Sequence, residues 1–270
     1  MSNRWVATLA LSLVGCGAFN YEDADGPRYA GAGPPSPPPG PRLRVATLNV
    51  ELGEHVPLAI EELEAVGPFD VVLLQEMDAE GTRRVAAALG MRWVYYPASI
   101  HHERDFGNAV LSRWPIGEDH KVLLPHRAPF DGRARAAVTA TIDHPYGSFF
   151  VSSVHNETVL LPLAARLEQA AAILDDASAH YPDQPGLIAG DFNSAEPLAV
   201  ERTVALHRRR GLRPIAPGPG EITADTPLGP VTLDLMFARG LGDLVARGVA
   251  PSRGASDHRV VWAELRLQDR

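Results

Sequence analysis

Short apolar runs ended by polar side chains recur along this chain. Runs of about four to six Val, Ile, Leu or Phe residues bounded by turn residues are typical of buried strands. Four segments place acidic, amide or imidazole side chains at the end of such a run, and these are residues 45–49, 71–76, 187–193 and 256–258. Because the ends of neighbouring strands can converge in a cleft, the pattern predicts one polar site.

Between these runs lie stretches with helical periodicity. Residues 57–66, 81–89 and 163–178 have apolar side chains spaced for one face of a helix. In the last stretch these side chains are Leu163, Leu167, Ala170, Ala171 and Leu174. The periodicity predicts core-facing helices that alternate with short strands, and therefore an α/β domain.

Two of the runs end in an oxygen-bearing side chain. Glu76 closes the run 71–76, and a carboxylate inside a sheet is costly unless it is paired or bound to a metal. Because Mg²⁺ takes oxygen ligands, Glu76 is the natural magnesium ligand; a solvated Glu at a strand end is the alternative. Asn49 closes the run 45–49 in the same manner, and taken alone it fits the start of a loop.

Asp191 and Asn193 follow the apolar run 187–190. Residues two apart on an extended chain point to the same side, so both side chains can face one substrate. The alternative is ordinary turn chemistry, because Asp and Asn both cap and turn the backbone well.

Two histidines follow or precede predicted strands. His258 stands before the last predicted strand, and its neighbour Asp257 can share a site with it only if the chain turns there. A surface pair is the alternative. Asp234 ends another short run and could accept a hydrogen bond from the His258 imidazole and fix its tautomer. His155, after the run 149–154, completes the set.

Taken in order, these segments resemble the endonuclease/exonuclease/phosphatase superfamily, which includes deoxyribonuclease I, abasic-site exonucleases, sphingomyelinases and inositol polyphosphate 5-phosphatases. The resemblance covers about residues 42–267 and rests on Leu-Gln-Glu, Gly-Asp-Phe-Asn and Ser-Asp-His motifs that end at Glu76, Asn193 and His258. Residues 106–116 resemble its Gly-x-Ala-x-Leu-Ser-Arg segment. The resemblance implies a four-layer α/β sandwich, in which two packed, mainly antiparallel β-sheets are flanked by helices.

The resemblance also implies a metal and a water nucleophile. Glu76 and Asp257 would bind a divalent cation, Mg²⁺ with Mn²⁺ as the alternative. Asp191 and Asn193 would orient the attacking water and the phosphoryl oxygens. These roles agree with elementary chemistry, because a phosphodiester anion repels a nucleophile and its cleavage needs a Lewis acid and directed donors.

The remaining implied roles fall to imidazoles and substrate contacts. His258, oriented by Asp234, would act as a general base or as a charged phosphate contact. His155 would donate to the phosphate or to the leaving oxygen. Substrate contacts are expected from Asn49, Asn108 and Arg135.

Two segments depart from the superfamily pattern. Asn156 and Glu157 follow the first histidine where relatives often have Leu, which could alter contacts to the leaving group. The polar cluster 101–105 precedes the Gly107 segment. A surface loop explains this cluster more simply than a second metal site.

The N-terminus predicts export. Arg4 precedes an apolar stretch, residues 5–14, that is shorter than the roughly 20 residues that span a bilayer. This stretch leads to Leu-Val-Gly-Cys at residues 13–16, which resembles the bacterial lipobox, whose Cys is lipidated. Cys16 is the only cysteine and therefore forms no disulfide within the chain. A signal peptide cleaved elsewhere is the alternative.

These features divide the chain into three parts. Residues 1–15 are a predicted lipoprotein signal peptide, 16–41 a lipid-anchored tether rich in Pro and Gly, and 42–270 the endonuclease/exonuclease/phosphatase domain. The domain is long enough for one substantial core, and we expect a monomer. Gly17 rather than Asp after the lipidated residue favours an exported lipoprotein of the outer membrane.

Charge bears on the substrate. The chain is formally −8, and −9 once Arg4 leaves with the signal peptide, so a broad basic surface for duplex DNA is not expected. Lys121 is the sole lysine, and Arg127 and Arg133 cluster near Arg135, where phosphate contact and simple solvation are equally open. The run 208–210 reads as a solvated helix end.

The leading hypothesis is therefore a Mg²⁺-dependent phosphodiester hydrolase, nuclease-like, exported and lipid-anchored. The alternative keeps the chemistry and replaces nucleic acid with a phospholipid or inositol-phosphate head group. A noncatalytic envelope-binding lipoprotein is a third hypothesis. The complete set of acidic, amide and imidazole residues disfavours it, because a binding module has no chemical need for that set.

Overall fold

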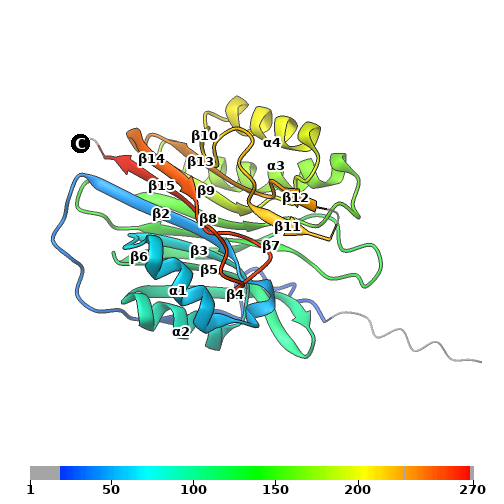
Figure 1. Cartoon of the computed structure of the whole chain (residues 1–270), viewed down its shortest axis with the longest axis horizontal. Coiled ribbons are helices and arrows are strands. Elements are labelled where there is room, and N and C mark those ends of the chain that lie inside the picture. The colour runs from blue at the N-terminus through cyan, green and yellow to red at the C-terminus, as the bar shows by residue number, and fades with distance from the viewer. Residues whose placement is uncertain (1–18, 228, 268–270) are drawn as a thin grey trace, which may run out of the picture.

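Two β-sheets pack face to face in this protein, and helices cover their outer faces (Figure 1). The computed structural model describes residues 19–227 and 229–267. Helices α1 (Val56–Val66) and α2 (Ala79–Leu89) lie over one sheet, and α3 (Leu163–His180) and α4 (Pro197–Arg209) over the other. The four-layer sandwich predicted from the sequence is confirmed.

The first sheet has seven strands in the described part of the chain, in the order β1-β4-β5-β3-β2-β15-β14. Its neighbours are antiparallel except for the central pair β2 and β3, which is parallel. The strands are β1 (Tyr29–Gly31), β2 (Arg42–Asn49), β3 (Val71–Met77), β4 (Arg92–His101), β5 (Arg104–Ser112), β14 (Asp243–Val249) and β15 (Val261–Arg266).

The second sheet has six strands among the described residues, in the order β10-β13-β9-β8-β7-β6, and its parallel pair is β8 and β9. The strands are β6 (Ile116–Leu123), β7 (Ala136–Ile142), β8 (Phe149–His155), β9 (Gly186–Asp191), β10 (Arg213–Ala216) and β13 (Asp234–Arg239). A separate hairpin joins β11 (Ala224–Thr226) to β12 (Gly229–Val231), and the 3₁₀ turn η1 (Glu51–Gly53) follows β2.

Strand β3 shows why the central runs are continuously apolar rather than alternating. Val71 and Leu73 lie in the core between the sheets, whereas Val72 and Leu74 lie in the core beneath α1 and α2. All four side chains are fully buried. A strand covered on both faces needs apolar residues at every position, so polar residues are confined to its end.

The three predicted helices are present, with bounds shifted by one or two residues at some ends. Asp78 caps α2 by accepting from the Gly81 amide at 2.6 Å, and this cap extends the helix beyond the predicted start. Helix α4 was predicted only by its end. The Arg run 208–210 lies exposed at its C-terminal end, as expected of a solvated helix end, and cationic side chains there interact favourably with the helix dipole.

The N-terminal segment differs from the expected tether. Residues 19–31 lie along the domain, because β1 pairs with β4 and Asn20 forms a bridge with Ser99. Strand β4 would otherwise present an unpaired edge, which invites aggregation. The described part of the predicted tether therefore begins on the domain instead of extending from it. The signal peptide and Cys16 lie outside the described residues, and no helix within residues 19–267 is both long and apolar enough to cross a bilayer.

Lys121 fastens this segment to the second sheet. Its ammonium group is buried and donates to the carbonyl oxygens of Tyr21 at 2.9 Å, Gly26 at 2.8 Å and Pro97 at 3.3 Å. Burial lowers its pKa to about 8. The three carbonyls replace the water that the ammonium loses.

We expect Lys121→Met to loosen the N-terminal segment, because three carbonyl groups lose their donor. Hydrogen exchange of the Tyr21 and Ile100 amides, which bond across this contact, should accelerate by about tenfold or more. Arg127→Ala is the control, since its ion pair with Glu22 in the same segment is exposed and such pairs contribute little. Equal exchange rates in the two variants would contradict the anchoring role.

Candidate active site

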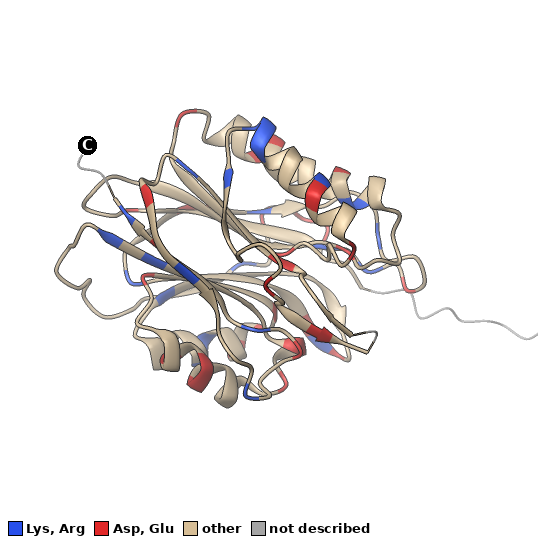
Figure 2. Cartoon of the chain, turned by 45° about the horizontal axis from the view of Figure 1, so that its top comes forward, with Lys and Arg blue, Asp and Glu red and all other residues tan. Residues whose placement is uncertain are grey.

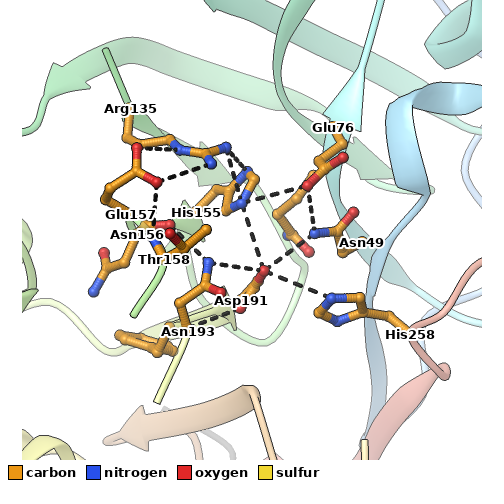
Figure 3. Close-up of polar contacts among 12 residues, drawn as sticks. Asn49, Glu76, Arg135, His155, Asn156, Glu157, Thr158, Asp191, Asn193 and His258 are labelled. Carbon is orange, nitrogen blue, oxygen red and sulfur yellow. Dashed lines mark hydrogen bonds and ion pairs between the residues drawn. The ribbon is translucent and has the colours of Figure 1, made fainter. Parts of the chain in front are cut away.

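The candidate site lies where the two parallel strand pairs end. Asn49 and Glu76 stand at the carboxyl ends of β2 and β3, and His155 and Asp191 at those of β8 and β9. Parallel neighbours end at the same edge of a sheet. The two pairs also contact each other across the sandwich. Four side chains from distant parts of the sequence therefore meet at one point (Figure 3).

Asn49 joins the two sheets within the site. Its amide nitrogen Nδ2 donates to Glu76 Oε1 and to Asp191 Oδ2, each at 3.1 Å (Figure 3). Its carbonyl Oδ1 accepts from the Glu51 amide at 3.1 Å. The Asn49 side chain thus holds a carboxylate from each sheet in fixed positions.

Glu76 has an unusual backbone for its residue type. Its φ is 58°, in the left-handed region that residues other than Gly, Asn and Asp rarely adopt. The second carboxylate oxygen, Oε2, accepts from the Leu52 amide at 3.1 Å. Side chains held in such strained conformations cluster at functional sites, and here the conformation keeps the carboxylate turned into the site.

Asp191 and Asn193 converge through a turn. Asn193 has φ 50°, so the expected extended geometry was wrong at this residue. Its backbone amide donates to Asp191 Oδ1 at 2.8 Å and its side-chain amide donates to Oδ2 at 3.2 Å. Turn chemistry and a shared site are therefore not alternatives here, because the turn brings both side chains together.

His258 pairs with Asp234, as the sequence predicted. His258 Nδ1 donates to Asp234 Oδ2 at 2.9 Å, and Asp234 is fully buried at the start of β13, opposite Asp191 in the sheet register. His258 Nε2 lies 3.8 Å from Asp191 Oδ2. Burial opposes the charged imidazole, but Asp234 and Asp191 outweigh it and raise the pKa of His258 to about 10.

His155 contacts both site carboxylates. Its Nε2 atom lies 3.6 Å from Glu76 Oε1 and 3.5 Å from Asp191 Oδ2. Burial, followed by the positive charges of Arg135 and His258, lowers the pKa of His155 well below its ordinary value. The imidazole is therefore neutral at physiological pH, and it can donate or accept one hydrogen bond at each nitrogen.

Arg135 lies beside His155 and pairs with a residue that was not predicted as part of the site. Its guanidinium contacts the His155 ring nitrogens at 3.1 and 3.2 Å and donates to Glu157 at 3.1 Å, and both charged side chains are buried. Burial opposes ionisation of Glu157, but Arg135 outweighs it and lowers the pKa of Glu157. Asn156 and Glu157 are the residues at which the sequence departs from the superfamily pattern, and that departure is the signal for Glu157.

Two predicted residues lie less centrally. Asp257 is exposed at its side chain, with Oδ1 3.9 Å from His258 Nε2, and its backbone amide donates to Glu51 Oε2 at 3.1 Å. Asn108 is buried beneath the site and donates from Nδ2 to the carbonyls of Ala136 and Ser153. These two contacts use both amide protons of Asn108, so its amide does not donate to a substrate in this arrangement. Substrate binding by Asn108 stays a prediction. Glu51 was missed, although its place two residues after Asn49 in a strand-end motif is a readable signal.

The donor set fits a divalent cation. Glu76 and Asp191 bring carboxylate oxygens together, and such hard oxygen ligands suit Mg²⁺. Asp191, Asp234 and His258 also place ligand atoms within 4.8 Å of one another. The buried Oδ1 of Asp234 has no hydrogen-bond partner. Because His258 Nδ1 already bonds Asp234, the oxygens of Glu76 and Asp191 are the better ligands for a hard ion.

A bound cation would polarise a phosphoryl oxygen at this site. Burial raises the pKa of Asp191 to about 7 in the metal-free chain, and a bound cation would keep this carboxylate ionised, where it can accept a hydrogen bond from an attacking water. The charged His258 and the amide of Asn193 are placed to stabilise negative charge on the phosphoryl oxygens. Together these groups can cleave a phosphate ester with a water nucleophile.

Comparison with known proteins agrees with this geometry. The model of the Endonuclease/Exonuclease/phosphatase family matches residues 46–258. The chain belongs to this family. Its members are hydrolytic phosphoesterases, among them nucleases, phosphatases and phosphodiesterases, so the chain is a phosphoesterase. A search of curated proteins finds no match.

Solved structures share the fold of this family member. An endonuclease/exonuclease/phosphatase from Beutenbergia cavernae is 24% identical with TM-score 0.68, covering 84% of this chain and 72% of its own. The catalytic domain of human Nocturnin with bound sulfate is 18% identical with TM-score 0.67, covering 88% and 96%. The mannosyl-6-phosphatase Bt3783 of Bacteroides thetaiotaomicron is 17% identical with TM-score 0.63, covering 82% and 98%. At these identities the likeness concerns the fold alone.

The raised pKa of His258 predicts a pH dependence of stability in the metal-free chain. A histidine whose folded pKa exceeds its ordinary 6.5 contributes stability that is fully present below pH 6.5 and is lost as the pH rises through about 10. In EDTA, the difference in unfolding free energy between the wild type and His258→Gln should therefore shrink between pH 7 and pH 10. Urea unfolding at several pH values measures it. A constant difference would mean that His258 is not held as a cation.

Proposed function

We propose that this phosphoesterase is a Mg²⁺-dependent phosphodiester hydrolase, exported and anchored in the cell envelope through a lipid on Cys16. The convergence of Glu76 and Asp191 on the Asn49 amide, with His258 3.8 Å from Asp191, carries the proposal. It brings two metal-ligating carboxylates and a cationic imidazole within reach of one phosphate.

The site residues would divide the work by chemistry. Glu76 and Asp191 would hold Mg²⁺, with Mn²⁺ as the alternative metal. Asp191, with Asn193, would also orient the attacking water. His258 would contact the phosphoryl oxygens as a cation, and His155 and Arg135 would face the leaving group. Glu157 would keep the Arg135 guanidinium in place by its buried ion pair.

Nucleic acid is the first candidate substrate. Arg133 and Arg135 lie over the Phe106 ring at 6.0 and 5.0 Å, and Phe106 in turn lies 5.6 Å from His155. Phe106 itself is buried, so bases cannot stack on it, and only the two guanidinium groups beside the reacting phosphate support nucleic acid; such local contacts need no broad basic surface. Figure 2 agrees, because Lys and Arg are spread over many elements and interleaved with Asp and Glu instead of forming one broad basic face.

We expect the purified chain from Gly17 onward to hydrolyse bis-p-nitrophenyl phosphate with Mg²⁺ or Mn²⁺ and to lose this activity in EDTA. Asp191→Asn and His258→Ala should each lower kcat by about 10²–10⁴ fold, because the first removes a charged metal ligand and the second a cation at the phosphate. His180→Ala is the matched control, since His180 also contacts an aspartate but lies at the far end of α3. Equal losses in all three variants, or metal-independent turnover, would contradict the assigned roles.

A second candidate substrate, the head group of a phospholipid, is favoured by exposed apolar side chains near the site. Phe130 is 85% exposed in the loop that leads to Arg135, and Val159 and Leu160 are 47% and 57% exposed just after Glu157. Phe19, also exposed, stands three residues after Cys16, a reach of about 10 Å of extended chain. A lipid on Cys16 would therefore keep this side of the domain close to a membrane.

Vesicles separate the two substrates. If a phospholipid is the substrate, Phe130→Ser and Leu160→Ser should lower head-group release from phosphatidylcholine and phosphatidylglycerol vesicles about tenfold or more, because their apolar side chains no longer enter the lipid surface. Turnover of bis-p-nitrophenyl phosphate should be unchanged. Val245→Ser, an exposed apolar position on β14, is the control. Degradation of plasmid or single-stranded DNA with no head-group release would select the nuclease.

A further inference from the structure

A second cluster of metal-ligating side chains lies away from the active site. His120 stands on β6, the edge strand of the second sheet. Asp176 and His180 lie four residues apart on α3 and therefore on the same face of that helix. The α3 helix begins beside the active site, and His180 is its last residue, so about 17 residues of helix, or roughly 25 Å, separate this cluster from that end.

The three side chains already point at one another. His120 Nε2 lies 3.0 Å from Asp176 Oδ1, and His180 Nδ1 lies 3.1 Å from the same oxygen. The ligand atoms of all three residues lie within 4.8 Å of one another. Ligand atoms about 2.0–2.1 Å from a tetrahedral ion are separated from one another by roughly 3.3 Å. Small rotations of the His120 and His180 rings are therefore sufficient to enclose an ion.

The chemistry of this donor set selects a transition metal. Two imidazoles and one carboxylate are ligands typical of Zn²⁺, whereas Mg²⁺ prefers oxygen alone. A water would complete the tetrahedron on the solvent side, where His180 is 57% exposed at its side chain. The site contains no thiol, so cysteine oxidation does not affect it.

Neighbouring rings hold the cluster in place. The Tyr181 ring stacks on His120 with 6.3 Å between ring centroids, and the His120 and His180 rings lie 4.8 Å apart. The stacked Tyr181 ring restricts His120 to few orientations.

We propose that His120, Asp176 and His180 bind one Zn²⁺ ion that fastens the C-terminal end of α3 to the edge strand β6. The proposal is independent of the phosphodiesterase function, because none of its residues reaches the active site. An ordinary His–Asp hydrogen bond is the competing explanation, and the same chain supplies a comparison for it. His126 lies 2.6 Å from Glu168 of α3, which repeats the pairing of a histidine with a helix carboxylate but lacks the second histidine.

Zinc counting tests the proposal. Four proteins are dialysed against a buffer that contains Zn²⁺ and a large excess of Mg²⁺: the wild type, His180→Ala, His120→Ala and the control His126→Ala. Bound zinc is then measured by mass spectrometry. All four proteins retain the active site, so the difference reports the cluster alone. We expect one zinc fewer per chain in His180→Ala and His120→Ala than in the wild type and His126→Ala.

Thermal unfolding gives a second readout. Zn²⁺ should raise the Tm of the wild type and of His126→Ala more than that of His180→Ala, because an ion that binds the folded chain stabilises it. His180 is exposed, so its replacement should leave the fold intact, and an unchanged circular dichroism spectrum checks this. Equal zinc content and equal Tm shifts in the wild type and His180→Ala would overturn the proposal and leave a plain hydrogen bond.

Discussion

The bond network of the Asn49 amide is the constraint on which the rest of the site depends. One side-chain nitrogen donates to carboxylates of both sheets, Glu76 and Asp191. A buried and a partly buried carboxylate so close together repel each other unless a cation or shared donors compensate. The site therefore needs the sandwich, since only the packing of one sheet on the other delivers both charges to the same amide. The closeness of the two carboxylates also makes these strand ends suited to a divalent ion.

A polar layer beneath the site keeps this arrangement rigid. Gln75 donates to Ser153 Oγ at 2.9 Å across the two sheets, and Ser153 Oγ donates to the Leu74 carbonyl at 2.9 Å. Asn108 bonds the backbones of β7 and β8 in the same layer. Buried polar groups that are fully paired fix one relative position of the elements that they join. The strand ends are thus held in register before any substrate arrives.

The N-terminal segment extends this support to the rim of the site. Asn20 donates to the Gly132 carbonyl at 3.0 Å and accepts from the Ala134 amide at 2.7 Å. These bonds hold the loop that leads into Arg135, which contacts His155. The segment thus does more than cover the edge of β4, because it links the proposed membrane anchor to the loop that leads into Arg135.

The sequence by itself determined the order of elements and most of the chemistry. Apolar runs that end in polar residues located Asn49, Glu76, Asp191 and His258, because a strand covered on both faces is largely apolar until its end. Tertiary structure decided the rest. The pairing of Arg135 with Glu157, the packing of residues 19–31 on β4, and the approach of His120 to α3 join segments far apart in the chain. No local pattern records such contacts, since they arise from the packing of whole sheets and helices.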